Sequence, residues 1–495
     1  MNTNAQNHRL ILKNIARRAM LERGLLPDFS AEALAELKLL HSPTLQDAAL
    51  IPNSQAIRDL RRLLWCSIDN DDSRDLDQLT AAEGLPGGKT KIFVSIADVS
   101  VCIAKGSAID QHASHNTTSV YTAAEIFPML PEKVSTDLTS LNFGEDRLSI
   151  VIEMVFNPDG SLDDSQIYQA WVHNYAKLAY NSVAAWLDDE ADIPGAVAAV
   201  SGLAENLKLQ DQIGQRIKAY RHNHGALSLE TIEARPVFEG DQILALEREE
   251  KNRAKEIIED FMIAANGVTA RFLDAKKFPS IRRMVRTPKR WERIVEIAAE
   301  YNYRLPETPD AKALQLFLVK QRNADPLRFP DLSLSVIKLL GAGEYIADSP
   351  DGDVPGHFGL AVKDYTHSTA PNRRFPDLVT QRLLKAALAG MPVPYSKEEL
   401  DALAAHCTRA EDDANKVERQ VGKSAAALLL SSRIGEQFDS IVTGSAAKGT
   451  WVRLLHFPVE GKLVGSSNGV DVGHRIRVRL ESVDIERGFI DFVKV

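Results

Sequence analysis

The chain has 495 residues and is 44% apolar, which allows roughly two to four domains and a large core. No apolar run approaches the roughly 18 residues of a membrane span, and the N-terminus has no apolar stretch, so we expect neither a membrane span nor a signal peptide. The net charge of −9 counts against nucleic-acid binding, because phosphate affinity comes from Lys and Arg, unless basic residues gather locally.

The first segment of the chain predicts two helices. Apolar residues recur at helical spacing between Leu10 and Met20, and Gly24 ends this helix. Ser30 is a typical N-cap for a second helix that begins directly after it. We expect a small helical N-terminal domain over residues 1–58, with a helix-turn-helix as one arrangement and a packing role favoured over DNA binding.

The central part of the chain, residues 59–434, mixes strands with helices. Apolar and β-branched runs predict buried strands, and a 3.6-residue apolar period predicts helices. The strands are expected at residues 91–97 and 147–156, and the helices at residues 255–272, 377–389 and 401–433. This mixture predicts one large α+β domain.

The C-terminal segment, residues 435–495, changes to the period of strands. Five short alternating stretches are separated by Gly, Asn and Asp turns, at residues 439–444, 450–455, 461–464, 475–480 and 488–492. Five short strands at this spacing predict an OB-fold β-barrel. The overall fold class is therefore α+β, with a separate C-terminal barrel.

Cysteine usage and one basic segment limit the setting further. The three cysteines, Cys66, Cys102 and Cys407, are odd in number and far apart, so we expect reduced thiols and a cytoplasmic protein. Residues 281–293 carry six basic side chains and one acidic side chain. This segment predicts either the wall of a basic channel inside an acidic shell or a solvated turn and helix start.

The most acidic part of the chain is residues 67–79, SIDNDDSRDLDQL, which follows an apolar run. Five carboxylates repel one another there and would raise one another's pKa values: Asp69, Asp71, Asp72, Asp75 and Asp77. A folded chain keeps such a group either as a solvated acidic loop or by neutralising it with cations. Clustered carboxylate oxygens suit Mg²⁺ or Mn²⁺.

A calcium-binding EF-hand is excluded by the spacing of this stretch. That loop needs Gly at its sixth position and Glu at its twelfth. Counting from Asp69 places Arg74 and Thr80 at those positions. Counting from Asp71 places Leu76 and Ala82 there, so both registers fail.

The spacing Ile68-Asp69, five residues, then Asp75-Leu76-Asp77 resembles the catalytic signature of the ribonuclease II (RNB) family. Each block of this resemblance is weak alone, but the blocks follow one another in the family's order. They continue as IADVS (96–100), TSVY (118–121), PMLPE (128–132), IEDFMIAAN (258–266), HFGLA (357–361) and TAPNRRFPDL (369–378). The C-terminal barrel, in turn, resembles the RNA-binding barrel named after a small-subunit ribosomal protein.

The resemblance implies a magnesium-dependent exoribonuclease, with Mn²⁺ as an alternative ion. Such an enzyme acts on the 3′ end of single-stranded RNA and releases nucleoside 5′-monophosphates processively, in RNA degradation and turnover. Two divalent ions would activate water and neutralise charge on the phosphoryl group. With this resemblance we expect a catalytic RNB domain over residues 59–434, a monomer, and no membrane partner.

The resemblance also assigns the acidic residues. Asp69, Asp75 and Asp77 match three of the family's four metal-binding aspartates, and Asp77 is implied in catalysis as well. The two-residue spacing of Asp75 and Asp77 points both side chains the same way in extended backbone. The fourth aspartate falls at Gln78, whose amide oxygen can ligate without a negative charge. We therefore expect weaker binding of at least one ion than in relatives with four aspartates.

Four further residues are implied in substrate contacts. Arg373 matches the catalytic arginine on the scissile phosphate, and Arg374 beside it is a second RNA contact. Tyr180 matches a tyrosine near the terminal base, and Glu259 a hydrogen-bonding partner of the last ribose. The alternatives are a helix-start ion pair between Arg373 and Asp377, a core tyrosine, and an ordinary acid on a helix surface.

The sequence departs from the family at two more places. A family aromatic that stacks on bases falls near Leu229, so the base stack is expected to be looser here, because such stacking contributes roughly 1–3 kcal/mol per base. The family's bacterial members usually carry two OB-type domains before the catalytic part, and the short helical segment before Asp69 cannot hold them. Glu418 is a weaker candidate for a further contact.

Two other functions compete with an exoribonuclease. A catalytically silent RNA-binding or translation-control protein would keep this fold after losing ligands, and Gln78 is one such loss. A DNA exonuclease would make use of a helical N-terminal module. Three aspartates with Arg373 disfavour the silent protein, and Glu259 with the terminal barrel disfavours the DNA enzyme.

Overall fold

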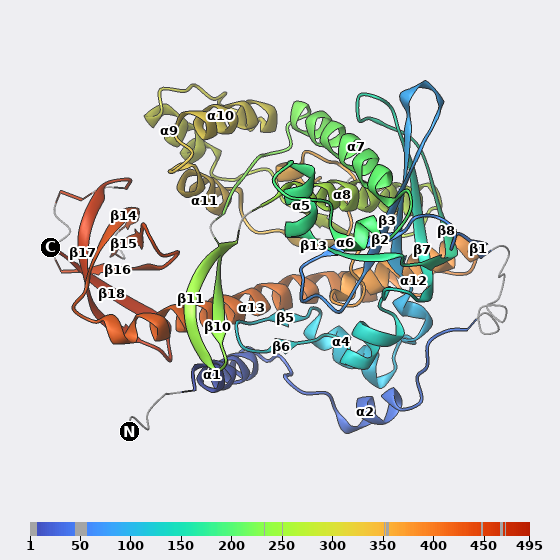
Figure 1. Ribbon diagram of the computed structural model, residues 1–495, viewed down its shortest axis with the longest axis horizontal. Helices are drawn as coiled ribbons and strands as arrows, with labels where there is room; N and C mark the ends of the chain where they lie inside the picture. The colour runs from blue at the N-terminus through green and yellow to red at the C-terminus, as the bar shows by residue number, and fades with distance from the viewer. Residues whose placement is uncertain are drawn as a thin grey trace.

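The computed structural model describes residues 7–44, 57–231, 233–249, 251–350, 352, 356–446, 449–465, 469–470 and 472–495. Its largest sheet is a seven-stranded mixed sheet with the order β1-β8-β7-β4-β3-β2-β9, which lies on the right-hand side of Figure 1. In that order the strands are β1 (Arg58–Asp59), β8 (Leu162–His173), β7 (Asp146–Phe156), β4 (Thr90–Ala97), β3 (Gln78–Gly84), β2 (Cys66–Asp69) and β9 (Ala176–Ala179). All neighbours run antiparallel except the two edge pairs β1–β8 and β2–β9, which are parallel.

Helices alternate with the remaining strands along the chain. The helices are α1 (His8–Glu22), α2 (Ala31–Leu37), α4 (Ala108–Asn116), α5 (Tyr180–Leu187), α6 (Gly195–Ala198), α7 (Leu203–Asn223), α8 (Arg253–Ala275), α9 (Trp291–Glu300), α10 (Ala311–Ala324), α11 (Phe329–Leu340), α12 (Phe375–Ala389) and α13 (Lys397–Leu430). Single turns lie at η1 (Pro86–Gly88), η2 (Val99–Val101), η3 (Lys133–Leu138), η4 (Phe358–Leu360) and η5 (Ser431–Arg433). None of these helices is long and apolar enough to cross a membrane.

Three two-stranded hairpins or ribbons stand apart from the main sheet. They are β5 (Val120–Tyr121) with β6 (Ile126–Phe127), β10 (Glu233–Glu239) with β11 (Gln242–Glu249), and β12 (Ser280–Met284) with β13 (Glu344–Asp348). Each pair is antiparallel. The predicted strands at 91–97 and 147–156 are confirmed as β4 and β7, and the predicted central helices as α8, α12 and α13.

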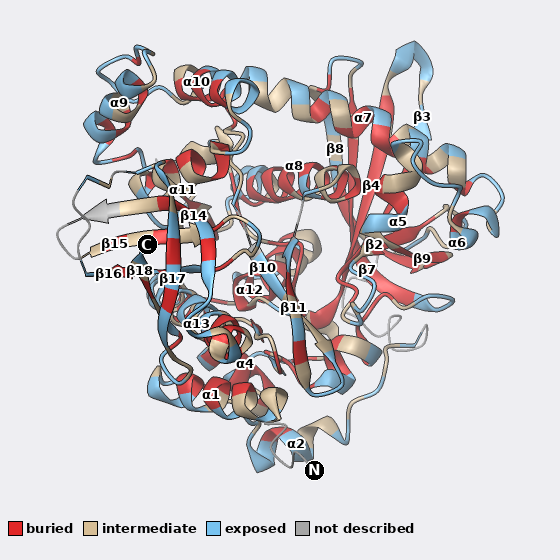
Figure 2. Cartoon of the chain, turned by 60° about the vertical axis from the view of Figure 1, so that its left-hand side comes forward, coloured by how far each residue is buried: buried red, intermediate tan, exposed pale blue. Residues whose placement is uncertain are grey.

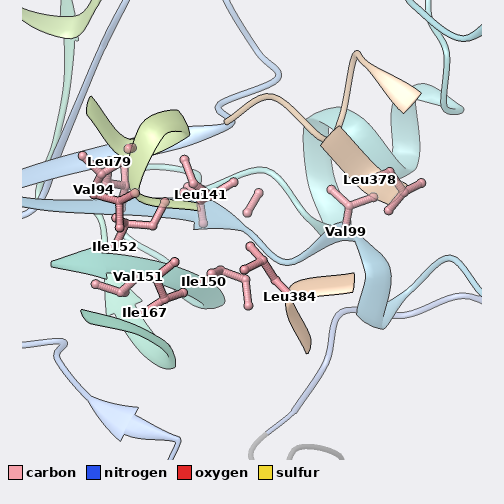
Figure 3. Close-up of a cluster of buried hydrophobic side chains, with 14 of the residues drawn as sticks. Leu79, Val94, Val99, Leu141, Ile150, Val151, Ile152, Ile167, Leu378 and Leu384 are labelled. Carbon is pink, nitrogen blue, oxygen red and sulfur yellow. The ribbon is translucent and has the colours of Figure 1, made fainter. Parts of the chain in front are cut away.

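The main core lies around β4 and β7, which Figure 2 shows as buried along most of their length. Both strands are mostly apolar and mostly buried because helices cover the sheet, and their polar exceptions include Lys91 and Ser95 in β4 and Ser149 and Glu153 in β7. Helices α7 and α8 contact the sheet, and α12 contributes Leu378 and Leu384 to the same cluster (Figure 3). This packing brings the start of α12 close to the end of the sheet that holds the acidic turn.

The two N-terminal helices pack on different parts of the molecule. Ser30 accepts a hydrogen bond from the Ala33 backbone at 3.2 Å and so caps α2, as its sequence predicts. The apolar face of α1 is buried against α13, whereas α2 packs on α4. A helix-turn-helix would need α1 and α2 to pack on each other, and their largest contacts lie elsewhere.

The C-terminal segment forms the predicted closed five-stranded barrel. In barrel order its strands are β14 (Gln437–Ala446), β15 (Gly449–Leu454), β16 (Glu460–Val464), β18 (Phe489–Lys494) and β17 (Arg475–Asp484). The barrel core continues into the end of α13 through Ala427 and Leu430. Arg453 of β15 also donates two hydrogen bonds to Asp331 of α11, at 2.6 and 3.1 Å. The α+β fold class with a C-terminal barrel is confirmed.

The basic segment 281–293 does not form an open row of cations. Arg282 pairs with Asp348, Arg283 with Glu411 and Arg286 with Glu344. The guanidinium of Arg293 pairs with an acid of the same helix, and that of Arg290 donates to a main-chain carbonyl. Ion pairing within the fold therefore accounts for most of this charge, and residues 281–284 lie in the mostly buried strand β12 rather than in a solvated turn.

Candidate active site

The acidic turn connects two neighbouring strands of the main sheet. Asp69 is the last residue of β2, and Gln78, directly after Asp77, is the first residue of β3. The turn is held from two sides, because Lys177 donates to the Ser73 carbonyl at 2.5 Å and Asp72 pairs with Arg235 of β10 at 2.9 Å. Asp71 is exposed. The strand ends therefore fix Asp69 and Asp77, while Asp71 and Asp72 point to solvent and to the β10–β11 hairpin.

Asp77 is 3% exposed and lies between the sheet and the start of α12. Its Oδ1 accepts the backbone N–H of Asn372 at 3.0 Å, and its Oδ2 lies 3.6 Å from Arg373 Nε. That Oδ2 is buried and has no hydrogen-bond partner among the described residues. Burial raises the pKa of Asp77 to about 8, against the opposing charge of Arg373 and with the added repulsion of Asp75.

Asp69 and Asp75 complete the acidic group. Burial raises the pKa of Asp69 to about 7, again against Arg373 and with Asp75 adding repulsion. Asp69 Oδ2 is also buried without a partner in the described part of the chain. Asp75 Oδ2 accepts a hydrogen bond from the Tyr121 hydroxyl at 3.0 Å. The three aspartates that the sequence analysis singled out are thus brought together around one arginine.

These residues fit a divalent cation. Two buried carboxylate oxygens without partners, beside a third carboxylate, form a site whose charges a cation would neutralise. Among the described residues no three acidic, histidine or cysteine side chains are grouped so that they could hold one ion alone. Water or substrate oxygens would have to complete the shell, as is usual for Mg²⁺ in phosphate-processing sites.

The raised pKa values make cation binding dependent on pH. A folded metal-free protein near pH 7 keeps protons on Asp77 and partly on Asp69, and a cation must displace them. We expect Mg²⁺ binding at pH 7 to release about one proton or more, and to tighten with fewer protons released as the pH rises to 9. Titration calorimetry in two buffers with different protonation enthalpies measures this. A proton release near zero at pH 7 would contradict the shifts.

The two neighbouring arginines are separated by the structure. The Arg373 side chain is 45% exposed and faces Asp77. Arg374 instead donates to Asp377 at 2.7 Å, within the buried start of α12. The helix-start ion pair considered for Arg373 is therefore made by Arg374, and Arg373 keeps an accessible guanidinium beside the carboxylates.

Tyr180 is the first residue of α5 and lies close enough to Asp69 for the two groups to interact electrostatically. Burial raises the pKa of its hydroxyl, and the charge of Asp69 raises it further, so the phenol stays protonated. Lys255 Nζ lies 5.9 Å from the centre of its ring. Tyr180 thus connects the acidic group to the cavity that Lys255 lines.

That cavity has a volume of about 470 Å³ and lies between α7, α8 and α10. Glu259 lines it and accepts a hydrogen bond from Lys251 at 3.2 Å. Lys218, Arg221 and Arg322 line it as well, each paired with an acid. The cavity therefore offers both acceptors for hydroxyl groups and cations for phosphates.

Leu229, near which the resemblance places a family aromatic, also lines this cavity. Two contacts outside the cavity hold this segment in place. The Ser228 N–H donates to Gln315 of α10 at 2.7 Å, and Leu229 packs on the core of α9–α11. The wall at this point is aliphatic and rigidly supported.

Tyr121 was missed as a site residue although its block, TSVY, was recognised. Its hydroxyl reaches Asp75, and its backbone N–H donates to Glu418 of α13 at 2.8 Å. Asn372, within another recognised block, was also missed, because its contribution is a backbone N–H. Glu418, the weaker candidate, supports the β5–β6 hairpin and is linked to the acidic group through Tyr121.

Comparison with known proteins identifies the architecture. Over residues 57–390 the chain matches the RNB domain. The chain belongs to the RNB family. Residues 436–495 match the RNase II-type exonuclease C-terminal S1 domain. The resemblance read from the sequence motifs is therefore confirmed, and the barrel of this RNB protein is of the S1 type.

Relatives of this RNB protein include two ribonucleases R. That of Escherichia coli (strain K12) is 30% identical over an alignment of 470 residues that covers 88% of this chain and 57% of the relative. That of Aquifex aeolicus (strain VF5) is 31% identical over 463 residues, 88% of this chain and 64% of the relative. The chain thus spans less than two thirds of the length of these relatives.

Solved structures share the fold. Mycoplasma genitalium RNase R in complex with ribose-methylated single-stranded RNA has a TM-score of 0.86 at 23% identity, covering 98% of this chain and 78% of its own. Yeast Ssd1, a pseudonuclease, has a TM-score of 0.72 at 15% identity, covering 92% of this chain and 56% of its own. Because a nuclease and a pseudonuclease share this fold, the fold alone does not establish activity, and the site residues must carry that argument.

Proposed function

We propose that this RNB protein is a divalent-metal-dependent 3′-5′ exoribonuclease that hydrolyses single-stranded RNA processively to nucleoside 5′-monophosphates. The observation that carries the proposal is the group Asp69, Asp75 and Asp77 around Arg373, inside a family whose relatives are ribonucleases. In the reaction a water oxygen forms a bond to phosphorus and the bond from phosphorus to the 3′-oxygen breaks. The products are a 5′-monophosphate and a new 3′-hydroxyl.

Asp69, Asp75 and Asp77 would hold the cations, preferably Mg²⁺ with Mn²⁺ as an alternative. Two such ions, when bound, activate the attacking water and neutralise charge on the phosphoryl and leaving oxygens. The protein fixes its own carboxylates for this task. The Asn372 N–H orients Asp77, and the Tyr121 hydroxyl orients Asp75.

The substrate contacts are assigned by chemistry. Arg373, whose guanidinium is accessible, would grip the non-bridging oxygens of the scissile phosphate with two parallel N–H donors. Tyr180 would contact the terminal nucleotide, and Glu259 would accept a hydrogen bond from the ribose 2′-hydroxyl, which distinguishes RNA from DNA. Arg374, paired with Asp377, would act on RNA at longer range than Arg373.

A degradation assay tests the proposal. The protein is incubated with a 5′-labelled RNA oligonucleotide or its DNA counterpart, with Mg²⁺ or with a chelator. We expect a ladder of shortened products from RNA and Mg²⁺ only. Binding of RNA without degradation would favour the catalytically silent RNA-binding protein. That alternative is suggested by Gln78 and by a pseudonuclease that shares this fold. A ladder from DNA would contradict the role of Glu259.

Gln78 provides a test of the metal site. It is buried, 8% exposed, and follows Asp77 directly. We expect Gln78→Asp to lower the Mg²⁺ concentration for half-maximal activity by roughly tenfold, because a fourth carboxylate adds one negative charge near the ions. Gln111→Asp, which adds the same charge on the surface of α4, is the control. An unchanged Mg²⁺ requirement in Gln78→Asp would contradict the weak-metal interpretation.

Leu229 provides a test of the RNA path. We expect Leu229→Phe to lower the KM for single-stranded RNA by roughly fivefold or more, because an aromatic ring at the cavity wall stacks on bases. Leu316→Phe, on the exposed side of α10, is the control. Steady-state kinetics on one oligonucleotide measure the effect, and an unchanged KM would place the bases away from this wall.

Three further assignments belong to the same proposal. The domain limits are 1–58 for a helical N-terminal segment, 59–434 for the catalytic domain and 435–495 for the barrel. We assign a monomer as part of the same proposal. A cytoplasmic location is supported by Cys66, Cys102 and Cys407, all of which are free thiols.

A further inference from the structure

Helix α1 is the part of the chain to which the proposed function gives no role. One face of the helix is apolar and packs on α13, as expected for an amphipathic helix. The same cluster contains Val120, Ala124 and Phe127, so α1 also packs on the β5–β6 hairpin. This hairpin presents Tyr121 to Asp75. Residues of α1 and the acidic group are therefore separated by a single hairpin.

Two arginines of α1 form ion pairs with distant parts of the chain. Arg9 pairs with Asp241 at the tip of the β10–β11 hairpin, 3.8 Å away, and its guanidinium lies 4.3 Å from the ring centre of Phe238. Arg18 pairs with Glu486, in the turn between the last two strands of the barrel. Arg9 and Arg18 are thus engaged with carboxylates of this chain, which argues for an internal structural role of this helix and against a nucleic-acid-binding face.

The contact closest to the chemistry is made by Arg17. Its Nη1 lies 3.6 Å from Oε1 of Glu125, in the turn of the β5–β6 hairpin, and the same guanidinium pairs with Asp28. Glu125 is only 27% exposed in its side chain, and its Oε2 is buried without a partner among the described residues. The positive charge of Arg17 therefore compensates a carboxylate that has lost much of its solvation.

The hairpin transmits this contact to Tyr121. The Thr122 hydroxyl donates to the Glu125 carbonyl at 2.6 Å, and the Thr122 N–H donates to the same carbonyl at 3.1 Å. Tyr121 lies beside Thr122 and is fixed on its other side by Glu418. Both hydrogen bonds end on the main-chain carbonyl of Glu125, so a shift of its main chain would be passed to Tyr121, whose hydroxyl donates to Asp75 at 3.0 Å.

We propose that α1 is a built-in brace of the carboxylate site, and that Arg17 is a positioning residue that acts through Glu125 and the β5–β6 hairpin on Tyr121 and Asp75. The test of this inference by RNA degradation rests on the proposed function. The test by Mg²⁺ binding rests only on the geometry of the carboxylates. Arg17 touches neither substrate nor cation.

A double-mutant cycle tests the brace. Arg17→Met is compared with Lys13→Met, one turn earlier on the same helix, each alone and combined with Tyr121→Phe. We expect Arg17→Met to lower kcat on RNA roughly two- to fivefold with KM unchanged, in line with a partly exposed ion pair, and Lys13→Met to change neither. In the Tyr121→Phe background, Arg17→Met should have no further effect, because the link to Asp75 is already broken.

Calorimetric Mg²⁺ binding repeats the cycle without needing turnover. Arg17→Met should weaken the binding roughly two- to fivefold in the wild-type background and leave it unchanged in Tyr121→Phe. Thermal unfolding of every variant identifies one that fails to fold, and Arg17→Lys then replaces Arg17→Met.

Two outcomes would overturn the brace. The first is that Arg17→Met lowers kcat and Mg²⁺ affinity by the same factor whether or not Tyr121→Phe is present. The second is that Arg17→Met changes these quantities no more than Lys13→Met does. Failure of the proposed function is separate, because a wild-type protein that does not degrade RNA still reports on the brace through Mg²⁺ binding.

Discussion

The substitution Asp77→Asn should abolish RNA degradation, with a fall in turnover of roughly 10³-fold or more. The amide keeps the acceptor for the Asn372 N–H, so the local hydrogen bond survives. What is lost is the negative charge beside Arg373 that a cation requires. Single-turnover degradation of a labelled oligonucleotide measures the effect.

The same substitution should make the metal-free protein more stable at high pH. The folded-state pKa of Asp77 is about 8, above the usual value near 4, so ionisation is harder in the folded than in the unfolded protein. The stability that the protonated form supplies is present below pH 4 and is lost as the pH rises through 8. Asn removes this loss, and we expect a gain on the order of 3 kcal/mol at pH 8, seen by chemical unfolding with a chelator present.

Asp72→Asn is the matched control for both measurements. Asp72 is an acid of the same turn, but it is exposed and paired with Arg235. Its replacement should leave turnover and metal-free stability nearly unchanged, because exposed ion pairs contribute about 0–1 kcal/mol. Equal losses in Asp72→Asn and Asp77→Asn would mean that the overall charge of the turn, and not a specific ligand, supports activity.

Replacement of Arg373 by lysine should lower turnover by about 100-fold or more. Lysine keeps the charge, but it cannot present two parallel N–H donors to phosphate oxygens. The charge of Arg373 also lowers the pKa values of Asp69 and Asp77. Because the substituted lysine keeps that charge, we expect it to change cation binding less than it changes turnover. A large fall in kcat with a small change in Mg²⁺ requirement is therefore the expected pattern.

Arg286→Lys is the control for this prediction. Arg286 is half exposed and paired with Glu344, away from the acidic turn. Its replacement should be nearly neutral. Near-normal turnover of Arg373→Lys would remove the guanidinium from the mechanism and leave Arg373 as a partner of Asp77 only.

Much of the catalytic part could be predicted because its key residues lie close together in sequence. Asp69, Asp75 and Asp77 lie in or beside one turn between two strands, so local strand periodicity already places them together where these strands meet the turn. Their roles remain predictions that the experiments above address. Arg373 was found only through the order of the motifs, since its approach to Asp77 joins segments that no local pattern connects.

The neighbours of the acidic turn could not have been predicted in the same way. Whether Arg373 or Arg374 pairs with Asp377 depends on how the start of α12 enters the core. That Tyr121 reaches Asp75 depends on a hairpin held between α1 and α13. The basic appearance of residues 281–293 was likewise resolved by acids from β13 and α13.

Five helices, two strands of the main sheet, the barrel and the family could be recognised in the sequence, because these follow from apolar periodicity, turn residues and the spacing of short motifs. Which carboxylates lose solvent and which arginine stays accessible become visible only in the folded chain. Burial and ion pairing join residues hundreds of positions apart, and their energies depend on the packed surroundings rather than on local sequence.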